Sequence, residues 1–223
     1  MAYFTAMQTL TKLIIRKGLT DHFLRVGQLD RLAGGSARRR YGLVNRAIKA
    51  GELVQIQRGL YMLTGKYRTL PFQPFALAQA IVPGSYISFE TALAYHGWIP
   101  EKVFSTSSVL PGRQSRHYED DELGIYSFYP LAVHREYFLE LVNRCRIDEQ
   151  MTLVAEPCRA LLDLICLRKI EWKGLAWLLE GLRIDSNALG NITRKDMKTL
   201  QQIYKHRRMK AFLSSFRREL GLD

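Results

Sequence analysis

The sequence predicts an α+β protein with two domains. Its 223 residues are enough to form two small hydrophobic cores. The net charge is +12, and residues 1–70 carry +10 of it, with 13 basic and three acidic residues. The spacing of apolar residues is helical near the N-terminus and becomes a mixture of helical and strand periods further on. A charge excess confined to one domain is typical of a domain that binds an anionic partner.

The first domain begins with two predicted helices. Residues 7–15 and 26–33 carry apolar side chains at helical spacing. Gly34 and Gly35 then predict a tight turn, because glycine accepts backbone angles that other residues resist. Ser36 follows this turn and is a favoured N-cap residue for a third helix.

The third predicted helix covers residues 37–50 and is rich in arginine. Its apolar side chains recur at helical spacing, which predicts a stripe that faces the core. The members of this stripe are Ala37, Tyr41, Val44 and Ile48. In this phase Arg39 and Arg46 project away from the core. The other positions assigned to the exposed side are Arg38, Arg40, Gly42, Leu43 and Lys49.

A hairpin completes the first domain. Residues 53–57 and 60–63 are predicted strands, and Arg58 and Gly59 form the turn between them. This order of helices and hairpin predicts a winged helix-turn-helix over residues 1–68, and the second helix of such a pair enters the major groove of DNA. The candidate DNA-binding residues are Ser36, Arg38, Arg39, Arg40, Gly42, Arg46, Lys49 and Arg58.

These candidates have different expected roles. Arg39 and Arg46 are expected to recognise guanine, because arginine pairs bidentately with guanine O6 and N7. The other basic side chains, the Ser36 hydroxyl and the amides at the helix N-terminus are expected to hold phosphates. Asn45 is expected to be a structural amide near the buried edge. Two alternatives stay open: a solvated helix face, and a basic surface that docks a protein or an RNA.

The second domain is predicted to mix helices and strands and to end in helices. Two prolines, Pro71 and Pro74, predict a stiff linker over residues 69–74, so the domain covers residues 75–223. Helices are expected at residues 75–81, at 87–95, from 157 onward, at 172–183 and at 194–219. Strands are expected at 103–109, 124–129 and 151–155, with a charged loop or hairpin at 113–124.

No catalytic chemistry is evident in the second domain. The sequence lacks the HExxH, GxSxG, P-loop and GxGxxG motifs, so we expect no enzyme activity, no cofactor and no metal. Arg159 and Asp163 are expected to form a structural ion pair within one helix. Three cysteines without CxxC spacing favour buried thiols in a reducing cytoplasm. No signal peptide and no membrane-spanning run of about 20 apolar residues is predicted.

The C-terminal stretch is basic. Residues 194–218 contain nine basic residues and one acid, interleaved with apolar positions. Such an element either braces an anionic partner such as DNA, RNA or an acidic protein, or is a solvated helix face. The sequence leaves these alternatives open.

Three segments resemble the AbiEi antitoxin family. Residues 51–63 resemble the family's wing, with Arg58, Gly59 and Tyr61 in place, whereas Gln55 stands where the family has an arginine. Residues 86–97 are similar to its "YIS-x-x-S/T-AL-x-x-HG" segment, and residues 154–164 resemble its "A-x-P-x-[KR]-A-L-x-D-L" helix. The resemblance extends over roughly residues 10–185.

The resemblance implies a bacterial type IV antitoxin. Its winged helix would bind double-stranded operator DNA and repress its own operon. Its C-terminal domain would counter a nucleotidyltransferase-like toxin, possibly without direct contact. A cytoplasmic monomer or weak dimer is expected. Regulators with this C-terminal domain also occur without a toxin neighbour, so a simple regulator stays an alternative.

Overall fold

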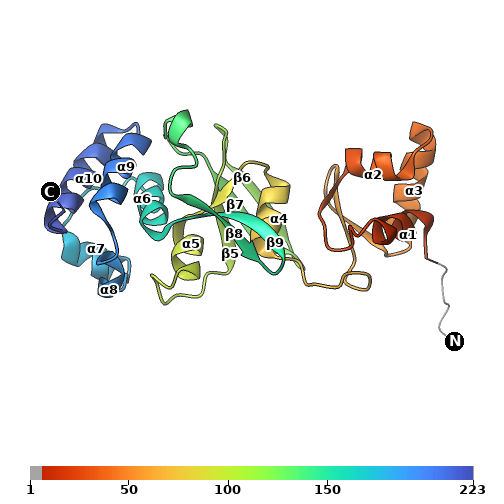
Figure 1. Ribbon diagram of the computed structural model, residues 1–223, viewed down its shortest axis with the longest axis horizontal. Coiled ribbons are helices and arrows are strands. Elements are labelled where there is room, and N and C mark those ends of the chain that lie inside the picture. The colour runs from red at the N-terminus through yellow and green to blue at the C-terminus, as the bar shows by residue number, and fades with distance from the viewer. Residues whose placement is uncertain (1–6, 223) are drawn as a thin grey trace. The chain divides into compact units, whose positions relative to one another are not determined.

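The computed structural model describes residues 7–222 and has the α+β fold that the sequence predicts. The chain folds into two compact units that divide between Gln73 and Pro74 (Figure 1). The first unit contains α1 (Thr9–Arg16), β1 (Leu24–Arg25), α2 (Val26–Ala33), α3 (Ala37–Lys49), β2 (Leu53–Gln57) and β3 (Leu60–Leu63).

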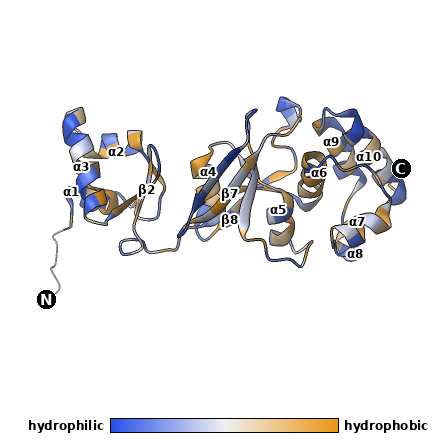
Figure 2. Cartoon of the chain, turned by 180° about the vertical axis from the view of Figure 1, so that it is seen from behind, coloured by the Kyte–Doolittle hydropathy of each residue, from blue (hydrophilic) through white to orange (hydrophobic). Residues whose placement is uncertain are grey.

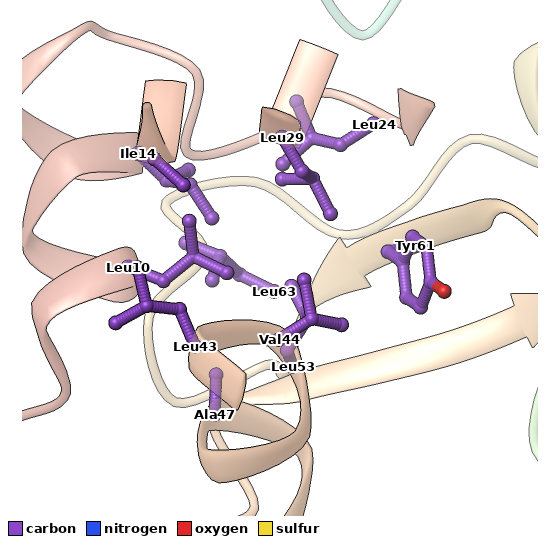
Figure 3. Close-up of a cluster of buried hydrophobic side chains, with 11 residues drawn as sticks. Leu10, Ile14, Leu24, Leu29, Leu43, Val44, Ala47, Leu53, Tyr61 and Leu63 are labelled. Carbon is purple, nitrogen blue, oxygen red and sulfur yellow. The ribbon is translucent and has the colours of Figure 1, made fainter. Parts of the chain in front are cut away.

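The first unit has the topology of a winged helix. Its strands form an antiparallel sheet in the order β1-β3-β2. β1 was not predicted, since two residues are too short to show a strand period; Leu24 and Arg25 pair with Tyr61 and Leu60. The helices pack on this sheet around one apolar core (Figure 3). The core residues include Leu10, Ile14, Leu29, Leu43, Val44, Ala47, Leu53 and Leu63.

The phase predicted for α3 is wrong. Tyr41 was assigned to the core stripe but is 72% exposed, and Ala37 is exposed as well. Leu43 was assigned to the outer side but is only 5% exposed. The helix packs through Leu43, Val44 and Ala47, whose side chains are wholly apolar, whereas a stripe containing Tyr41 would bury a polar hydroxyl group. This helix carries hydrophilic as well as hydrophobic residues (Figure 2).

The second unit is built on a six-stranded mixed sheet with the order β6-β7-β5-β4-β9-β8. β5 and β7 pair in parallel, as do β4 and β9. α4 lies on one side of the sheet and α5 and α6 on the other, with α7–α10 beyond α6 (Figure 1). The strands are β4 (Tyr86–Ile87), β5 (Ser105–Val109), β6 (Arg116–Asp120), β7 (Gly124–Tyr129), β8 (Val142–Ile147) and β9 (Gln150–Ala155). The helices are α4 (Pro74–Ile81), α5 (Phe89–Tyr95), η1 (Arg135–Tyr137), α6 (Pro157–Leu167), α7 (Leu175–Gly181), α8 (Ser186–Leu189), α9 (Arg194–Ile203) and α10 (Arg207–Glu219).

Some elements of this unit differ from expectation. β8 was missed, because this edge strand alternates charged and half-buried residues around Arg144 and Arg146. Of the two alternatives for residues 113–124, the hairpin is correct. The helix expected over 194–219 is broken at Tyr204, whose extended backbone forms a bridge with Val133.

A buried carboxylate joins several of these elements. The Asp163 Oδ1 atom accepts hydrogen bonds from Arg159 Nε at 2.9 Å and from the Tyr204 hydroxyl at 2.8 Å. Its Oδ2 atom accepts from the Ser88 hydroxyl at 2.8 Å and from the Tyr86 hydroxyl at 3.0 Å. The cluster therefore ties α6 to β4, to the start of α5 and to the connection between α9 and α10.

Arg159 completes this cluster. Its side chain and that of Asp163 are both 0% exposed. The guanidinium also donates to the Glu140 carbonyl at 2.8 Å and to the Tyr86 hydroxyl at 2.6 Å. Burial by itself would lower the pKa of Arg159, but the adjacent Asp163 carboxylate raises this pKa above its ordinary value. The structural ion pair expected from the sequence is therefore present, and each of its side-chain nitrogen and oxygen atoms has a hydrogen-bond partner.

Asp163→Ala is expected to lower the free energy of unfolding of the second unit by about 3–5 kcal/mol, because a buried arginine loses its counter-ion. All three tryptophans of the chain lie in this unit, so urea unfolding followed by tryptophan fluorescence reports on this unit. Glu149→Ala is the control, since its exposed ion pair with Arg146 should contribute less than about 1 kcal/mol. Equal losses in the two variants would contradict this ranking.

The same cluster predicts alkaline destabilisation. Burial, followed by the Asp163 carboxylate, raises the pKa of Tyr86 and Tyr204 well above the ordinary value of 10.0. Above about pH 10 the unfolded chain loses these protons while the folded chain keeps them, so stability is full below that pH and falls above it. Tyr204→Phe should reduce the slope of unfolding free energy against pH by about 1 kcal/mol per unit. An unchanged slope would show that Tyr204 is not protected.

Candidate nucleic-acid interface

The turn between α2 and α3 depends on glycine. Gly34 has φ 60° and ψ 179°, a region that is essentially restricted to glycine. Gly35 follows with φ 76°. Ser36 then begins α3 as its N-cap, and its hydroxyl oxygen accepts a hydrogen bond from the Arg39 amide at 3.3 Å. The turn and the cap therefore follow the sequence prediction, and the Ser36 oxygen is used within the chain.

Arg39 and Arg40 hold this turn together. Arg39 Nη1 donates to the Ala33 carbonyl at 2.5 Å and to the Gly34 carbonyl at 3.1 Å. Arg40 Nη1 donates to the Gly35 carbonyl, and Arg40 Nε lies 3.1 Å from Asp30 Oδ1. Cations at the C-terminal end of a helix are favoured, because its last carbonyls carry partial negative charge. Arg39 is exposed, as expected, but its guanidinium turns back to the carbonyls of residues 33 and 34.

The outward face of α3 carries a different set of residues. Positions 38, 41, 42, 45, 46 and 49 lie away from the side through which the helix packs. Arg38, Tyr41, Arg46 and Lys49 are exposed on this face, and Gly42 and Asn45 are partly buried. Hereafter these six residues are called the α3 outer face. Of the eight predicted DNA-binding residues, it contains Arg38, Gly42, Arg46 and Lys49.

Gly42 shapes the centre of this face. A Cβ atom at Gly42 would lie 3.2 Å from Arg46 Nη1. The absence of a side chain therefore leaves room for the Arg46 guanidinium along the helix surface.

The wing supplies Arg58. This exposed residue forms the hairpin turn with Gly59, whose φ of 80° favours glycine. The Gly59 carbonyl accepts a hydrogen bond from the Val26 amide at 3.0 Å, which fixes the turn to the start of α2. β2 is bulged between Gln55 and Gln57.

Several basic side chains in the described part of the first unit have no acidic partner. Within the described residues, Arg38, Arg46, Lys49 and Arg58 form no ion pair closer than 4.0 Å. The two nearest acids along the chain are occupied. Asp30 pairs with Arg40, and the buried Glu52 accepts hydrogen bonds from the Gln8 amide at 3.0 and 3.2 Å, at the start of α1. Four uncompensated cations on a helix face and a wing turn are chemically suited to phosphate oxygens.

Comparison with protein families bears directly on this segment. Residues 21–64 match the family model described as "Transcriptional regulator, AbiEi antitoxin". This segment, about a fifth of the chain, is therefore similar to the AbiEi regulator family. The resemblance stated from the wing motif is confirmed by this match, which also spans α2 and α3. The sequence has no match among curated proteins.

The first unit, called the AbiEi-type domain below, also binds residues 69 and 70, where the chain leads toward the second unit. Asp21 Oδ1 accepts hydrogen bonds from the amides of Thr69 and Leu70 at 2.9 and 3.0 Å, and Oδ2 accepts from the Thr69 hydroxyl. Burial opposes ionisation of this carboxylate, but these bonds and Arg68 outweigh it and lower the pKa of Asp21. Residues 69 and 70, predicted as part of the linker, are therefore anchored on this domain.

Across residues 7–222 no group of three metal-ligating side chains is found, and no helix there is long and apolar enough to cross a membrane. His96 Nε2 lies 2.9 Å from the Ala155 carbonyl, which is a structural contact. Burial raises the pKa of Cys158 to about 12 and that of Cys166 to about 11, so both thiols stay protonated.

Sequence reasoning missed two residues of the α3 outer face, namely Asn45, which was expected near the buried edge, and Tyr41. Tyr41 was placed in the core because its spacing to Val44 and Ile48 suits a helical stripe. The competing stripe of Leu43, Val44 and Ala47 contains only aliphatic side chains, and that difference is the signal that could have exposed Tyr41.

Arg39→Ala is expected to raise amide hydrogen exchange over residues 33–40 by about fivefold, because hydrogen bonds worth about 1 kcal/mol are lost from the turn. Mass spectrometry of the exchanged peptides measures this change. Arg38→Ala is the matched control, since Arg38 is exposed on the same helix. Similar exchange in the two variants would remove the structural role assigned to Arg39.

Proposed function

We propose that this protein is a DNA-binding transcriptional repressor that acts on its own operator through the α3 outer face and the wing residue Arg58. The observation that carries this proposal is a set of four cations, Arg38, Arg46, Lys49 and Arg58. They lie on α3 and on the wing, and within the described residues they form no ion pair. The AbiEi family match is consistent with it. The cysteine pattern favours a reducing cytoplasm as the site of action.

The proposed contacts follow from exposure and chemistry. Arg46 is the candidate for bidentate pairing with guanine. Arg38, Lys49 and Arg58 are candidates for phosphate contacts, which supply affinity without sequence information. Tyr41 offers an exposed ring for apolar contact with a thymine methyl group. Arg39 and Arg40 contribute indirectly, by holding the turn from which α3 starts.

The test is a fluorescence-anisotropy titration of the full chain against the DNA upstream of its gene and against a scrambled duplex, over a range of salt concentrations. A specificity ratio of about 10³ or more is expected for an autorepressor. Equal binding to both duplexes with a steep salt slope would reduce the role of this face to non-specific attraction. Absence of binding would favour a basic face that docks a protein or an RNA.

Substitutions should distinguish base contacts from phosphate contacts. Arg46→Ala is expected to cost about 1–3 kcal/mol on the operator and to relax its sequence preference. Lys49→Ala should weaken all duplexes alike and lower the salt slope by about 1. Lys12→Ala, an exposed lysine on α1, is the control. If Arg46→Ala leaves the specificity ratio unchanged, the assignment of base reading to this residue is wrong.

We further propose that the second unit carries an antitoxin activity against a nucleotidyltransferase-like toxin. The support is the resemblance of residues 86–97 and 154–164 to AbiEi segments, together with the antitoxin description of the matched family. A simple regulator without a toxin is the competing proposal. Adjacent coding of a nucleotidyltransferase-like gene would favour the antitoxin.

The two activities should be separable. A double variant Arg46→Ala/Lys49→Ala is expected to lose operator binding while still rescuing cells that express the adjacent toxin gene from an independent promoter. Colony counts with and without the variant measure the rescue. Loss of rescue in this folded variant would mean that neutralisation requires the DNA-binding face.

A further inference from the structure

The second unit contains a cavity that the proposed function does not use. Its volume is about 590 Å³, and small-molecule sites typically measure about 300–1,000 Å³. Its walls come from the segments after β5 and after β7, from η1 and from the connection between α9 and α10. All of these segments belong to one compact unit.

The position of the cavity in the sheet favours ligand binding. β5 and β7 are neighbouring parallel strands, and their last residues, Val109 and Tyr129, pair with each other. The cavity walls at residues 110–113 and 131–133 follow these two strand ends directly. In sheets with parallel strands, ligands bind outside the carboxyl ends of the strands. The cavity occupies that position.

Three cations surround the cavity. Arg113, Arg135 and Lys205 come from three different segments and are all exposed. Among the described residues that line the cavity, none is acidic. The nearest acid along the chain, Glu136, lies 3.8 Å from the ring of His134. Three like charges around one hollow repel one another, and an anion inside it would remove that repulsion.

The floor of the cavity is apolar. Leu110, Leu131, Val133 and Phe138 line it. The Phe138 ring is held by an edge contact with the ring of Tyr86, with 5.1 Å between centroids. Tyr86 belongs to the buried Asp163 cluster, so the floor contacts a hydrogen-bonded part of the interior. The cavity therefore combines exposed cations with an apolar floor.

We propose that this cavity binds a nucleotide, with its phosphates on the cationic rim and its base on the apolar floor. The guanidinium groups of Arg113 and Arg135 match phosphate oxygens bidentately, and Lys205 adds a point charge. A ligand that joins a flat ring to several negatively charged phosphates fits both the apolar floor and the cationic rim. The proposal is independent of operator binding. A free nucleotide and the phosphorylated end of a nucleic-acid strand share this chemistry.

The test is isothermal titration calorimetry of the full chain with ATP, GTP, CTP and UTP, and with inorganic triphosphate and adenosine as component probes. At least one nucleotide should bind at least tenfold more tightly than either component, because only the nucleotide engages rim and floor together. A 5′-phosphorylated single strand that displaces the nucleotide would assign the site to strand ends. Failure of that strand to compete would assign it to free nucleotides.

Paired variants make the test specific to the cavity. Arg135→Glu should weaken nucleotide binding by about tenfold or more, as expected for a lost charge-assisted contact. Arg144→Glu changes the net charge equally on β8, outside the cavity, and should leave binding intact. Tryptophan-detected urea unfolding confirms that both variants fold. The proposal is overturned if no nucleotide binds, if triphosphate binds as tightly as every nucleotide, or if both variants weaken binding equally.

Discussion

The second unit depends on the burial of one carboxylate. Asp163 is removed from water on α6, and a charge in that position is tolerated only if its oxygen atoms are fully hydrogen-bonded. Four donors meet this requirement, and they come from segments far apart in the chain. The placement of β4, the start of α5, the residues after η1 and the break between α9 and α10 all follow from satisfying this group and Arg159. The cavity floor contacts the same cluster through the rings of Phe138 and Tyr86.

This cluster also gives a structural role to residues in the two segments of the second unit that resemble AbiEi sequences. Tyr86 and Ser88 come from the segment similar to the family's "YIS" pattern, and Arg159 and Asp163 come from the "A-L-x-D-L" helix. The structure brings the two segments together through hydrogen bonds in the interior. Their resemblance to the AbiEi family therefore reflects the architecture of the unit more directly than it reflects a reactive site.

The boundaries of helices and strands were predicted more accurately from the sequence than the sides of a helix that are buried or exposed. α2, β2 and β3 have the expected boundaries, because local spacing, caps and turns determine them. Tyr41 and Leu43 were assigned to the wrong sides of α3, because a helix with two overlapping apolar stripes is rotated by its tertiary contacts. The break at Tyr204 depends on Asp163 and Val133, which are distant in sequence, so no local pattern could reveal it. Of the predicted interface, the cationic character of the helix and wing was derivable, whereas the division of the arginines between the turn and the outer face was not.

The partnership of Tyr204 with Asp163 has a consequence for synthesis on the ribosome. The AbiEi-type domain holds all of its own core residues within its first 63 positions, so it can fold as soon as that stretch emerges. The second unit holds a carboxylate whose fourth donor is translated 41 residues later. Its interior is completed only after α9 has been made. Every molecule therefore passes through a period in which its regulator domain is finished and its larger unit still lacks part of its interior.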